Sequence, residues 1–367
     1  MPPKNAVHGG VTLLFQLLPP GTVLRDRYKI IALVGQGGAG AVYQAEDLRL
    51  EGRMCAIKEV RPQPGASEEA IAQAQAQFRR EASTLARLDQ PNLPKVSDYF
   101  SRDGLDYLVM DFVAGRNLKE VLDEARRQNQ FLDEERVLAW AQQLCDALEY
   151  LHSQDPPVLH RDIKPANIKL TPEGRIKLVD FGLVKPLDPE DPRTITVLQG
   201  LGSLPYTPLE QYGGSIGHTD TRSDIYALGA TLYHLLTGRA PATAQERFLN
   251  PNALPPPRSI NPQITERTEA AILRAMSMHP EERPASIAEL RQALFSGLST
   301  ASSIHSPPVP RPSPWLQALR QNVILLLIVL LLLFIAVAIT WQATGTSVTT
   351  RPAALAAATA VIPTPPR

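Results

Sequence analysis

The first part of the chain, between residues 28 and 113, is dominated by short runs in which apolar and polar residues alternate. The clearest of these runs are residues 30–34, 41–45, 55–60 and 107–113. Alternation with a period of two predicts β-strands that bury one face. One stretch among them, residues 68–88, repeats its apolar side chains at near-helical spacing and predicts a single helix.

Beyond residue 114 the apolar residues recur at intervals of three and four, which is typical of helices. The clearest helix begins after Asp133, a residue type that favours the N-cap, and carries Glu134 and Glu135 in its first turn. Its apolar positions are Val137, Leu138, Ala141, Leu144, Leu148 and Leu151. Residues 28–294 are therefore expected to form an α+β domain, with a strand-rich segment before a helix-rich one.

The longest apolar run in the chain is VILLLIVLLLLFIAVAI, residues 323–339. A helix of this length is roughly 26 Å long, close to the thickness of a bilayer's hydrocarbon core. Trp315 and Trp341 flank the run at positions suited to the two membrane interfaces. A buried core helix is the alternative, but it needs a surrounding domain that these residues do not provide. We expect a transmembrane helix over residues 321–341.

The segments on either side of this run lack the pattern of a folded domain. Residues 295–320 are rich in Ser and Pro and predict a linker, and residues 342–367 are mostly Ala, Thr and Pro and predict a disordered tail. Residues 1–27 contain one short apolar patch followed by two prolines, without the features of a signal peptide. They predict a short extension or a packing strand.

Composition and charge separate the chain into two unlike parts. The 367 residues include 37 basic and 37 acidic side chains, and this balance argues against a protein that coats nucleic acid. The last acidic residue is Glu289, so residues 1–294 carry a net charge of −4 and the remainder carries +4. The two cysteines, Cys55 and Cys145, are too few for a disulfide framework or a four-cysteine zinc site and favour a reducing compartment.

A glycine-rich segment separates the first two predicted strands, and its residues are Gly35, Gln36, Gly37, Gly38, Ala39, Gly40 and, after Ala41, Val42. Glycines let backbone amides approach phosphate oxygens closely. The pattern alone is weak, because a dinucleotide fold needs a helix directly after it and a Walker loop needs Gly-Lys-Ser/Thr. Strand-like flanks predict a hairpin tip, and an ordinary glycine-rich turn remains the alternative at this point.

Lys58 stands near the end of the next predicted strand, directly after Ile57. A lysine in this place is usually a solvated edge charge, but beside a glycine-rich hairpin its ammonium lies near the same phosphates. Glu81, on the predicted helix, is a candidate to hold this lysine in place. Glu68 and Glu69 compete with it on sequence alone.

The strongest signal comes from two later motifs, His160-Arg161-Asp162-Ile163-Lys164-Pro165-Ala166-Asn167 and Asp180-Phe181-Gly182. Three further segments follow: Thr207-Pro208-Leu209-Glu210, residues 224–229 and Arg283. Together with the glycine segment and Lys58, these motifs resemble those of the protein kinase family, in the family's order. The resemblance covers residues 28–294 and implies a bilobal protein-kinase fold, with a β-rich N-lobe that has one main helix and a helical C-lobe.

The resemblance implies a binding site for ATP. The backbone of the glycine segment would cover the phosphates, and Lys58, paired with Glu81, would hold the α and β groups. The adenine would lie among the remaining cofactor-binding residues, namely Val42, Ala56 and the backbone groups of Asp111 and Val113, with Lys169 beneath it.

The resemblance also implies the metal ligands and the catalytic residues. Asn167 and Asp180 would supply hard oxygen ligands to Mg²⁺, with Mn²⁺ as a substitute. Asp162 would orient the substrate hydroxyl and accept its proton, and Lys164 would steady the transferred phosphate. Because Lys164 follows Asp162 by two residues and Ser203 keeps a hydroxyl that is usually provided by Thr, the chain is similar to the members that phosphorylate Ser or Thr.

Regulation is implied by Arg161, since in the family this arginine contacts a phosphate on the activation segment. That segment corresponds to residues 180–210 and offers Thr194 and Thr196. A phosphothreonine adds enough charge to order a loop against an arginine. Two ordinary solvated threonines are the alternative. The hypothesis is that autophosphorylation at one or both activates the enzyme.

The expected topology follows from the location of ATP inside the cell. The kinase domain is then cytoplasmic and the C-terminus extracytoplasmic, on a single-pass protein of the plasma membrane. Arg311 and Arg320 agree with the positive-inside rule, although Arg351 weakens the contrast. This layout resembles that of bacterial membrane-anchored, eukaryotic-like serine/threonine kinases.

The partners expected from this layout are ATP, protein substrates and the lipid bilayer, and not nucleic acid. Family analogy also allows a homodimer across the small lobes. A catalytically inactive membrane-tethered scaffold is the alternative function. Pseudokinases usually lack the lysine, the catalytic aspartate or the metal-binding aspartate, whereas Lys58, Asp162 and Asp180 are all present.

Overall fold

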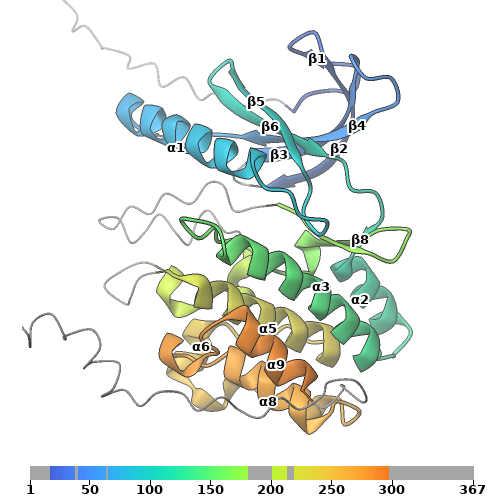
Figure 1. Ribbon diagram of the computed structural model, residues 1–367, viewed down its shortest axis with the longest axis vertical. Helices are drawn as coiled ribbons and strands as arrows, with labels where there is room; N and C mark the ends of the chain where they lie inside the picture. The colour runs from blue at the N-terminus through green and yellow to red at the C-terminus, as the bar shows by residue number, and fades with distance from the viewer. Residues whose placement is uncertain (1–16, 38–39, 63–64, 181–200, 213–218, 297–367) are drawn as a thin grey trace, which may run out of the picture. The chain divides into compact units, whose positions relative to one another are not determined.

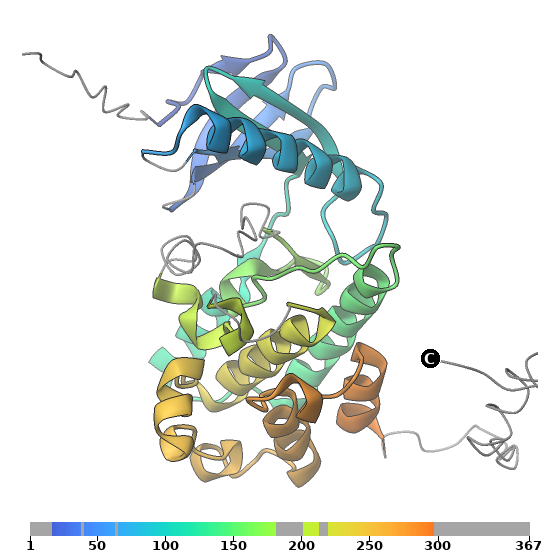
Figure 2. The ribbon, with the colours of Figure 1, turned by 90° about the vertical axis from the view of Figure 1, so that its left-hand side faces the viewer.

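The computed structural model describes residues 17–37, 40–62, 65–180, 201–212 and 219–296. These residues form two lobes, a strand-rich N-lobe followed by a helical C-lobe (Figures 1 and 2). The predicted α+β architecture with two lobes is therefore confirmed. Residues Ala301–Arg367 belong to a second unit of the chain that lies outside the described residues.

The N-lobe is built on a six-stranded antiparallel sheet with the order β1-β2-β3-β4-β6-β5. Its strands are β1 (Val23–Leu24), β2 (Tyr28–Gly37), β3 (Gly40–Asp47), β4 (Met54–Val60), β5 (Val96–Arg102) and β6 (Leu105–Asp111). Four of them, β2, β3, β4 and β6, correspond to the predicted alternating runs. The pattern missed β5 because only Val96 and Phe100 of its seven residues are buried.

Each face of this sheet buries a separate group of side chains. Tyr43, Ile57 and Val109 belong to a cluster on one face, while Leu108 and Met110 belong to the core that continues into the C-lobe. The cluster with Tyr43 also receives Leu17 and Leu18, and the amide of Leu18 donates to Tyr43 Oη at 3.2 Å. The described part of the predicted N-terminal extension is thus a packed segment of the N-lobe.

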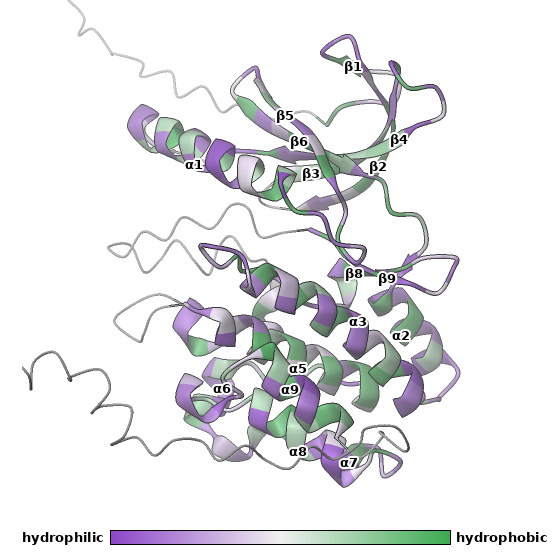
Figure 3. Cartoon of the chain, in the orientation of Figure 1, coloured by the Kyte–Doolittle hydropathy of each residue, from purple (hydrophilic) through white to green (hydrophobic). Residues whose placement is uncertain are grey.

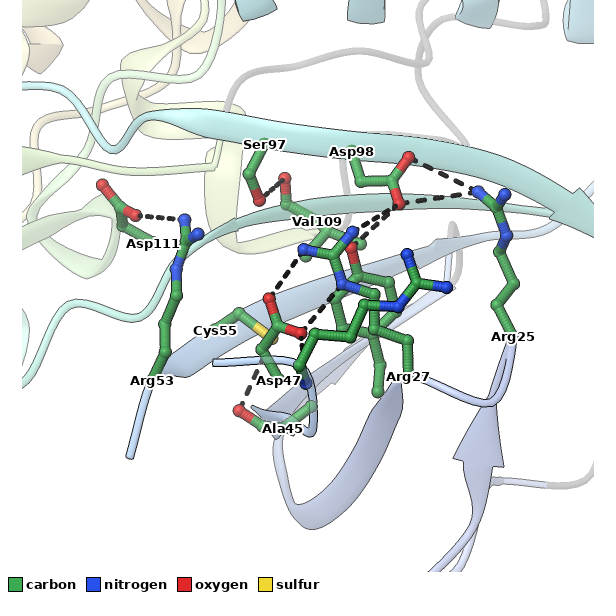
Figure 4. Close-up of polar contacts among 12 residues, drawn as sticks. Arg25, Arg27, Ala45, Asp47, Arg53, Cys55, Ser97, Asp98, Val109 and Asp111 are labelled. Atoms are coloured by element: carbon green, nitrogen blue, oxygen red, sulfur yellow. Dashed lines mark hydrogen bonds and ion pairs between the residues drawn. The ribbon is translucent and has the colours of Figure 1, made fainter. Parts of the chain in front are cut away.

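Charged side chains fix the turn between β1 and β2 onto the sheet (Figure 4). Arg27 donates to both oxygens of Asp47 at 2.8 Å, and Asp98 on β5 accepts from the hydroxyl of Tyr28 at 2.8 Å. The hydrogen bond from Arg27 lowers the pKa of the buried Asp47 carboxyl. Three strands that are distant in sequence are therefore joined at one end of the sheet.

The predicted helix of the N-lobe is α1 (Glu68–Ala86), which ends two residues before the predicted boundary. Ser67 caps its N-terminus by accepting a hydrogen bond from the amide of Ala70. The helix buries Phe78, Ala82 and Leu85. These residues are four and three positions apart, so they lie on one face of the helix. These contacts hold α1 against the sheet face that continues into the C-lobe core.

The C-lobe is arranged around α5 (Thr221–Thr237), which is buried along nearly all of its length. The clearest predicted helix is α3 (Glu134–His152), and Asp133 caps it as predicted. Both α2 and α3 carry hydrophobic residues beside hydrophilic ones (Figure 3). The other elements are β7 (Arg116–Asn117), α2 (Leu118–Arg127), β8 (Ile168–Leu170), β9 (Ile176–Leu178), α6 (Ala244–Leu249), α7 (Pro257–Ile260), α8 (Glu266–Ala275) and α9 (Ile287–Phe295), with short 3-10 turns at Pro165–Asn167, Leu201–Tyr206, Leu209–Gln211, Pro251–Ala253 and Pro280–Glu282.

A buried ion pair joins two of the late sequence motifs. Arg283 donates to Glu210 at 2.6 and 3.1 Å, and the two side chains are 0% and 4% exposed. The guanidinium also donates to the carbonyl of Ser277 and lies 5.0 Å from the ring centroid of Tyr226 on α5. Residues far apart in the chain are thereby fixed to the central helix.

Within the described ranges, no helix combines the length and the hydropathy that a membrane span requires. The predicted span, residues 321–341, lies outside those ranges, as do the predicted tail and nearly all of the predicted linker. Cys55 and Cys145 are both free and buried, and burial raises their thiol pKa values to about 11 and about 12.

Replacement of Arg283 tests the buried pair. Arg283→Ala leaves the Glu210 carboxylate buried without its partner, so we expect the free energy of unfolding to fall by about 3–5 kcal/mol. The matched control is Arg291→Ala, which removes a surface pair with Asp146 and Glu149 and should cost less than about 1 kcal/mol. Urea denaturation measures both losses, and equal losses would contradict the assigned role of Arg283.

Candidate active site

The glycine segment forms the hairpin between β2 and β3, as predicted. Gly37 pairs with Gly40 and Gly35 pairs with Val42 across the two strands. Gly40 has a φ of +148°, and a Cβ at this position would lie 1.8 Å from the carbonyl oxygen of Glu59. Only glycine fits there. Gly38 and Ala39 lie outside the described residues, while Gln36 pairs with Ala41.

The predicted nucleotide-binding side chains share one face of the sheet. Val42 pairs with Lys58 and Ala56 pairs with Met110. Directly paired residues lie on the same face and side chains alternate along a strand, so Val42, Ala56 and Lys58 face away from the Tyr43 cluster. The register therefore brings together residues that the resemblance implied separately.

The connection between the two lobes begins at Asp111, the last residue of β6. Its carboxylate lies 3.5 Å from the guanidinium of Arg53 (Figure 4) and accepts a hydrogen bond from the amide of Lys95 at 3.2 Å. The amide of Asp111 in turn donates to the carbonyl of Lys95 at 3.0 Å. These contacts hold the chain in place just before Val113, the second predicted backbone contact to adenine.

Lys58 forms an ion pair with Asp180, although the resemblance implied Glu81 as its partner. The pair joins residues of the two lobes, and the Lys58 side chain is only 16% exposed. Asp180 has a φ of +65°, which is uncommon for a residue other than glycine and places its carboxylate at the end of β9. Lys58, the cation predicted to bind phosphate, and Asp180, the anion predicted to bind the metal, therefore neutralise each other here.

Glu81 accepts a hydrogen bond from Gln77 at 2.6 Å. Burial raises the pKa of its carboxyl, while this hydrogen bond and the charges of Arg161 and Lys58 act in the opposite direction. The charge of Lys58 is thus felt at Glu81, whereas Glu69 lies in the first turn of α1 and is influenced by Ser67. Glu81 stays the predicted partner of Lys58, which is paired with Asp180 in this structure.

The catalytic loop gathers its polar groups around Asp162. Lys164 Nζ lies 2.8 Å from Asp162 Oδ2, and Asn167 Nδ2 donates to that same oxygen at 2.8 Å. The hydroxyl of Ser203 donates to Asp162 Oδ1 at 3.0 Å and accepts from Lys164 Nζ at 2.7 Å. Ser203 was noted in the sequence only as a marker of substrate type, and its contacts with Asp162 and Lys164, the two predicted catalytic residues, were not predicted.

A second residue that sequence reasoning missed is Asp224, which was recognised only as part of a late motif. Its carboxylate lies in the first turn of α5 and accepts from the amides of His160 and Arg161 at 2.9 and 2.8 Å. Nε2 of His152 lies 2.9 Å from the same carboxylate. Asp224 therefore holds the segment before Asp162 in place through hydrogen bonds to the backbone amides of that segment.

The electrostatics of Asp224 reflect these contacts. Burial by itself would raise the pKa of this fully buried carboxyl, but the hydrogen bond from His152 and the neighbouring histidines and amides hold it below the ordinary value of 3.8. The contact of His152 with Asp224 gives this histidine a supporting role for the loop.

The floor of the site is closed by a short sheet. Lys169 on β8, which the resemblance places beneath the adenine, donates to the carbonyl of Gly115 at 2.8 Å. Gly115 has a φ of +108°, and a Cβ there would lie 2.1 Å from the carbonyl oxygen of Leu170. The backbone just before β7 approaches Leu170 on β8 too closely for any other residue at position 115.

The predicted metal ligands match the donor chemistry of Mg²⁺. The amide nitrogen of Asn167 is used by Asp162, which leaves its oxygen as the group available to a cation. Asp180 adds a carboxylate. No group of three or more His, Cys, Asp or Glu suited to a metal occurs in the described part of the chain. Two oxygen ligands fit Mg²⁺, which completes its shell with phosphates and water.

Thr194 and Thr196, the predicted phosphorylation sites, lie outside the described residues.

The contribution of Asp224 is tested by Asp224→Asn. The amide cannot accept all three hydrogen bonds, so we expect the free energy of unfolding to fall by about 2–4 kcal/mol at neutral pH. Because the folded pKa of Asp224 is lowered, its stabilisation is present above the ordinary pKa and is lost as the pH falls through the folded pKa. Urea denaturation should therefore give a difference that is constant at neutral pH and shrinks below about pH 4. A difference that persists unchanged into acid would contradict this assignment.

Comparison with known proteins agrees with this geometry. The model of the protein kinase domain family matches residues 28–294. Serine/threonine-protein kinase PrkC of Bacillus subtilis is 35% identical over 270 residues, which cover 72% of this chain and 39% of that protein. The probable serine/threonine-protein kinase PknB of Lactococcus lactis is 32% identical over 291 residues, with 77% and 43% covered.

Solved structures show the same arrangement. The kinase domain of PknI from M. tuberculosis is 28% identical in sequence and superposes with a TM-score of 0.60. The match covers 76% of this chain and 98% of the PknI chain. The chain spans less than half the length of the two curated relatives. Since the matched region includes both lobes, the glycine hairpin and the catalytic loop, this chain belongs to the protein kinase family.

Proposed function

We propose that this protein is a bacterial serine/threonine protein kinase that transfers the γ-phosphate of ATP to Ser or Thr hydroxyls of proteins in signalling. The observation that carries the proposal is the arrangement around Asp162, where Lys164, Asn167 and Ser203 contact one carboxylate. The alternative of an inactive scaffold is not supported, because Lys58, Asp162 and Asp180 are all present and lie in the site.

Phosphoryl transfer needs alignment of the reacting groups and neutralisation of phosphate charge more than covalent chemistry. Asp162 accepts the proton of the substrate hydroxyl as the oxygen attacks the γ-phosphorus and the bond to the β-phosphate oxygen breaks. Lys164, beside Asp162, offers its ammonium to the transferred group. The hydroxyl of Ser203 on Asp162 Oδ1 supports this role, since it is an aliphatic hydroxyl of the same class as the substrate.

The ion pair between Lys58 and Asp180 must separate when the site is loaded. Mg²⁺, held by Asn167 and Asp180, would supply positive charge to the phosphate oxygens. Lys58 would then turn to the α and β phosphates, and Glu81 would become its carboxylate partner. The influence of the Lys58 charge on the pKa of Glu81 supports this exchange of partners.

The proposed setting of the kinase is the inner face of the plasma membrane. The apolar run of residues 323–339 supports a single span at residues 321–341, and Arg311 and Arg320 support a cytoplasmic kinase domain and an extracytoplasmic C-terminus. The proposal also includes autophosphorylation at Thr194 or Thr196, with Arg161 contacting the phosphate. It further includes a homodimer across the N-lobes.

Catalysis is tested with purified protein, Mg-ATP and a generic basic protein as substrate. Asp162→Asn removes the proton acceptor and should lower phosphate incorporation by about 10²- to 10⁴-fold. Asp146→Asn, on the surface of α3, is the matched control and should retain activity. Equal incorporation by Asp162→Asn and the parent would contradict the role of Asp162, and no incorporation by the parent protein would contradict the kinase proposal itself.

Membrane attachment is tested by fractionating cells that express the chain or a form ending at Ser296. The complete chain should remain in the membrane fraction after an alkaline carbonate wash and dissolve only in detergent. The shortened form should appear in the soluble fraction. Release of the complete chain by carbonate would exclude a transmembrane anchor.

A further inference from the structure

The short sheet of β7, β8 and β9 has one apolar face and one polar face. Ile168 on β8 and Leu178 on β9 are paired with each other and belong to the core of the C-lobe. Side chains alternate along a strand, so Lys169 and Lys177, which are also paired, lie on the opposite face. The sheet lies between the strands of the N-lobe and the helices of the C-lobe (Figure 3). Two lysines therefore stand side by side where the lobes meet.

The two ammonium groups have separate partners, as expected for like charges on directly paired residues, which repel each other. Lys177 donates to the carbonyl of Leu93 at 3.0 Å, in the segment between α1 and β5. Lys169 donates to the carbonyl of Gly115 at 2.8 Å, in the segment between β6 and β7. Both lysines are half-buried. Each of them therefore bonds the sheet to a segment of chain that leads to or from the N-lobe.

The segment that contains Gly115 is the connection between the lobes. Its residues 112–115 form no helix or strand, so their backbone groups depend on partners from elsewhere in the chain. The carbonyl of Gly115 has such a partner in Lys169. Val113, a predicted backbone contact to adenine, lies two residues before Gly115. The bond from Lys169 therefore holds the connection close to the point where the base is expected.

Lys169 also lies close to the predicted metal ligands along the chain. Asn167 directly precedes β8, and Asp180 follows the end of β9 by two residues. Lys169 is two residues beyond Asn167, which corresponds to about 7 Å along an extended chain. A lysine can cover an apolar surface with its methylene stem while its ammonium is engaged elsewhere. The same side chain can therefore support a base and bond to the connection.

We propose that Lys169 is a positioning residue for the nucleotide base. Its stem lies beneath the base, and its ammonium joins the connection at Gly115 to β8, so that Val113 is held at the distance from β8 that the base requires. An aliphatic residue at this position supplies the surface but not the bond. The proposal rests on the ATP-dependent function proposed above and adds a role for the lysine in binding the base.

The bond itself is tested without any nucleotide, by hydrogen–deuterium exchange of the complete chain. Lys169→Met keeps an unbranched stem and removes the donor, so the amides of residues 112–115 should exchange about three- to tenfold faster. Lys169→Arg keeps a donor and should restore the original rate. The matched control is Lys119→Met, which removes an exposed ammonium paired with Asp123 on α2 and should leave these amides unchanged. Unchanged exchange in Lys169→Met would overturn the proposal.

The consequence for the base is tested by calorimetry with two probes, Mg-ADP and adenosine. Lys169→Met should weaken both by about three- to tenfold, because both carry the base, whereas Lys169→Arg and Lys119→Met should bind both as the parent does. A loss confined to Mg-ADP would show that the ammonium acts as a charge on the phosphates and would contradict the assigned role. Equal or tighter binding of adenosine by Lys169→Met would contradict it as well.

Kinetics separate this role from catalysis and from the proposed function. Lys169→Met should raise the KM for ATP by the same three- to tenfold factor with little change in kcat, because Asp162 and Lys164 are untouched. A fall in kcat at unchanged KM would overturn the proposal. Failure of the parent protein to bind either probe would contradict the ATP-dependent function itself, whereas parental binding by Lys169→Met contradicts only the role of the lysine.

Discussion

The buried carboxylate of Asp224 is the contact on which the geometry of the catalytic loop depends. The residues before Asp162 form no helix or strand, so their amides need partners from elsewhere in the chain. Asp224 accepts hydrogen bonds from two of these amides, those of His160 and Arg161. Arg161, which directly precedes Asp162, has a φ of +64°. A residue in this conformation persists only where its surroundings fix it. The rigid helix α5 supplies that constraint.

A second constraint is electrostatic and acts between the lobes. Lys58 and Asp180 bring opposite charges together in a partly buried site, where an unpaired charge is costly. The same two groups are those proposed to bind phosphate and Mg²⁺. On that proposal, the ligands have to replace an existing ion pair, and the contact between the lobes changes when they do. Glu81, which is half-buried and accepts a hydrogen bond from Gln77, is the proposed new partner of the lysine.

Local features of the molecule could be predicted from the sequence, and partner choice could not. Alternation located β2, β3, β4 and β6, and capping located α3, because both depend on neighbours along the chain. The partner of Lys58 depends on how two lobes meet, across 122 residues of sequence. The role of Asp224 is likewise decided by a backbone contact 64 residues away.

The short sheet of β7, β8 and β9 lies next to the predicted nucleotide site. Side chains alternate along β8, so Lys169 and Leu170 point to opposite sides: Lys169 donates to Gly115, and Leu170 packs against the hydrophobic core. The close approach of Gly115 to Leu170 leaves no room for a Cβ. Because the backbone at residue 115 is fixed against Leu170, the ammonium of Lys169 is held at one position beneath the predicted nucleotide site.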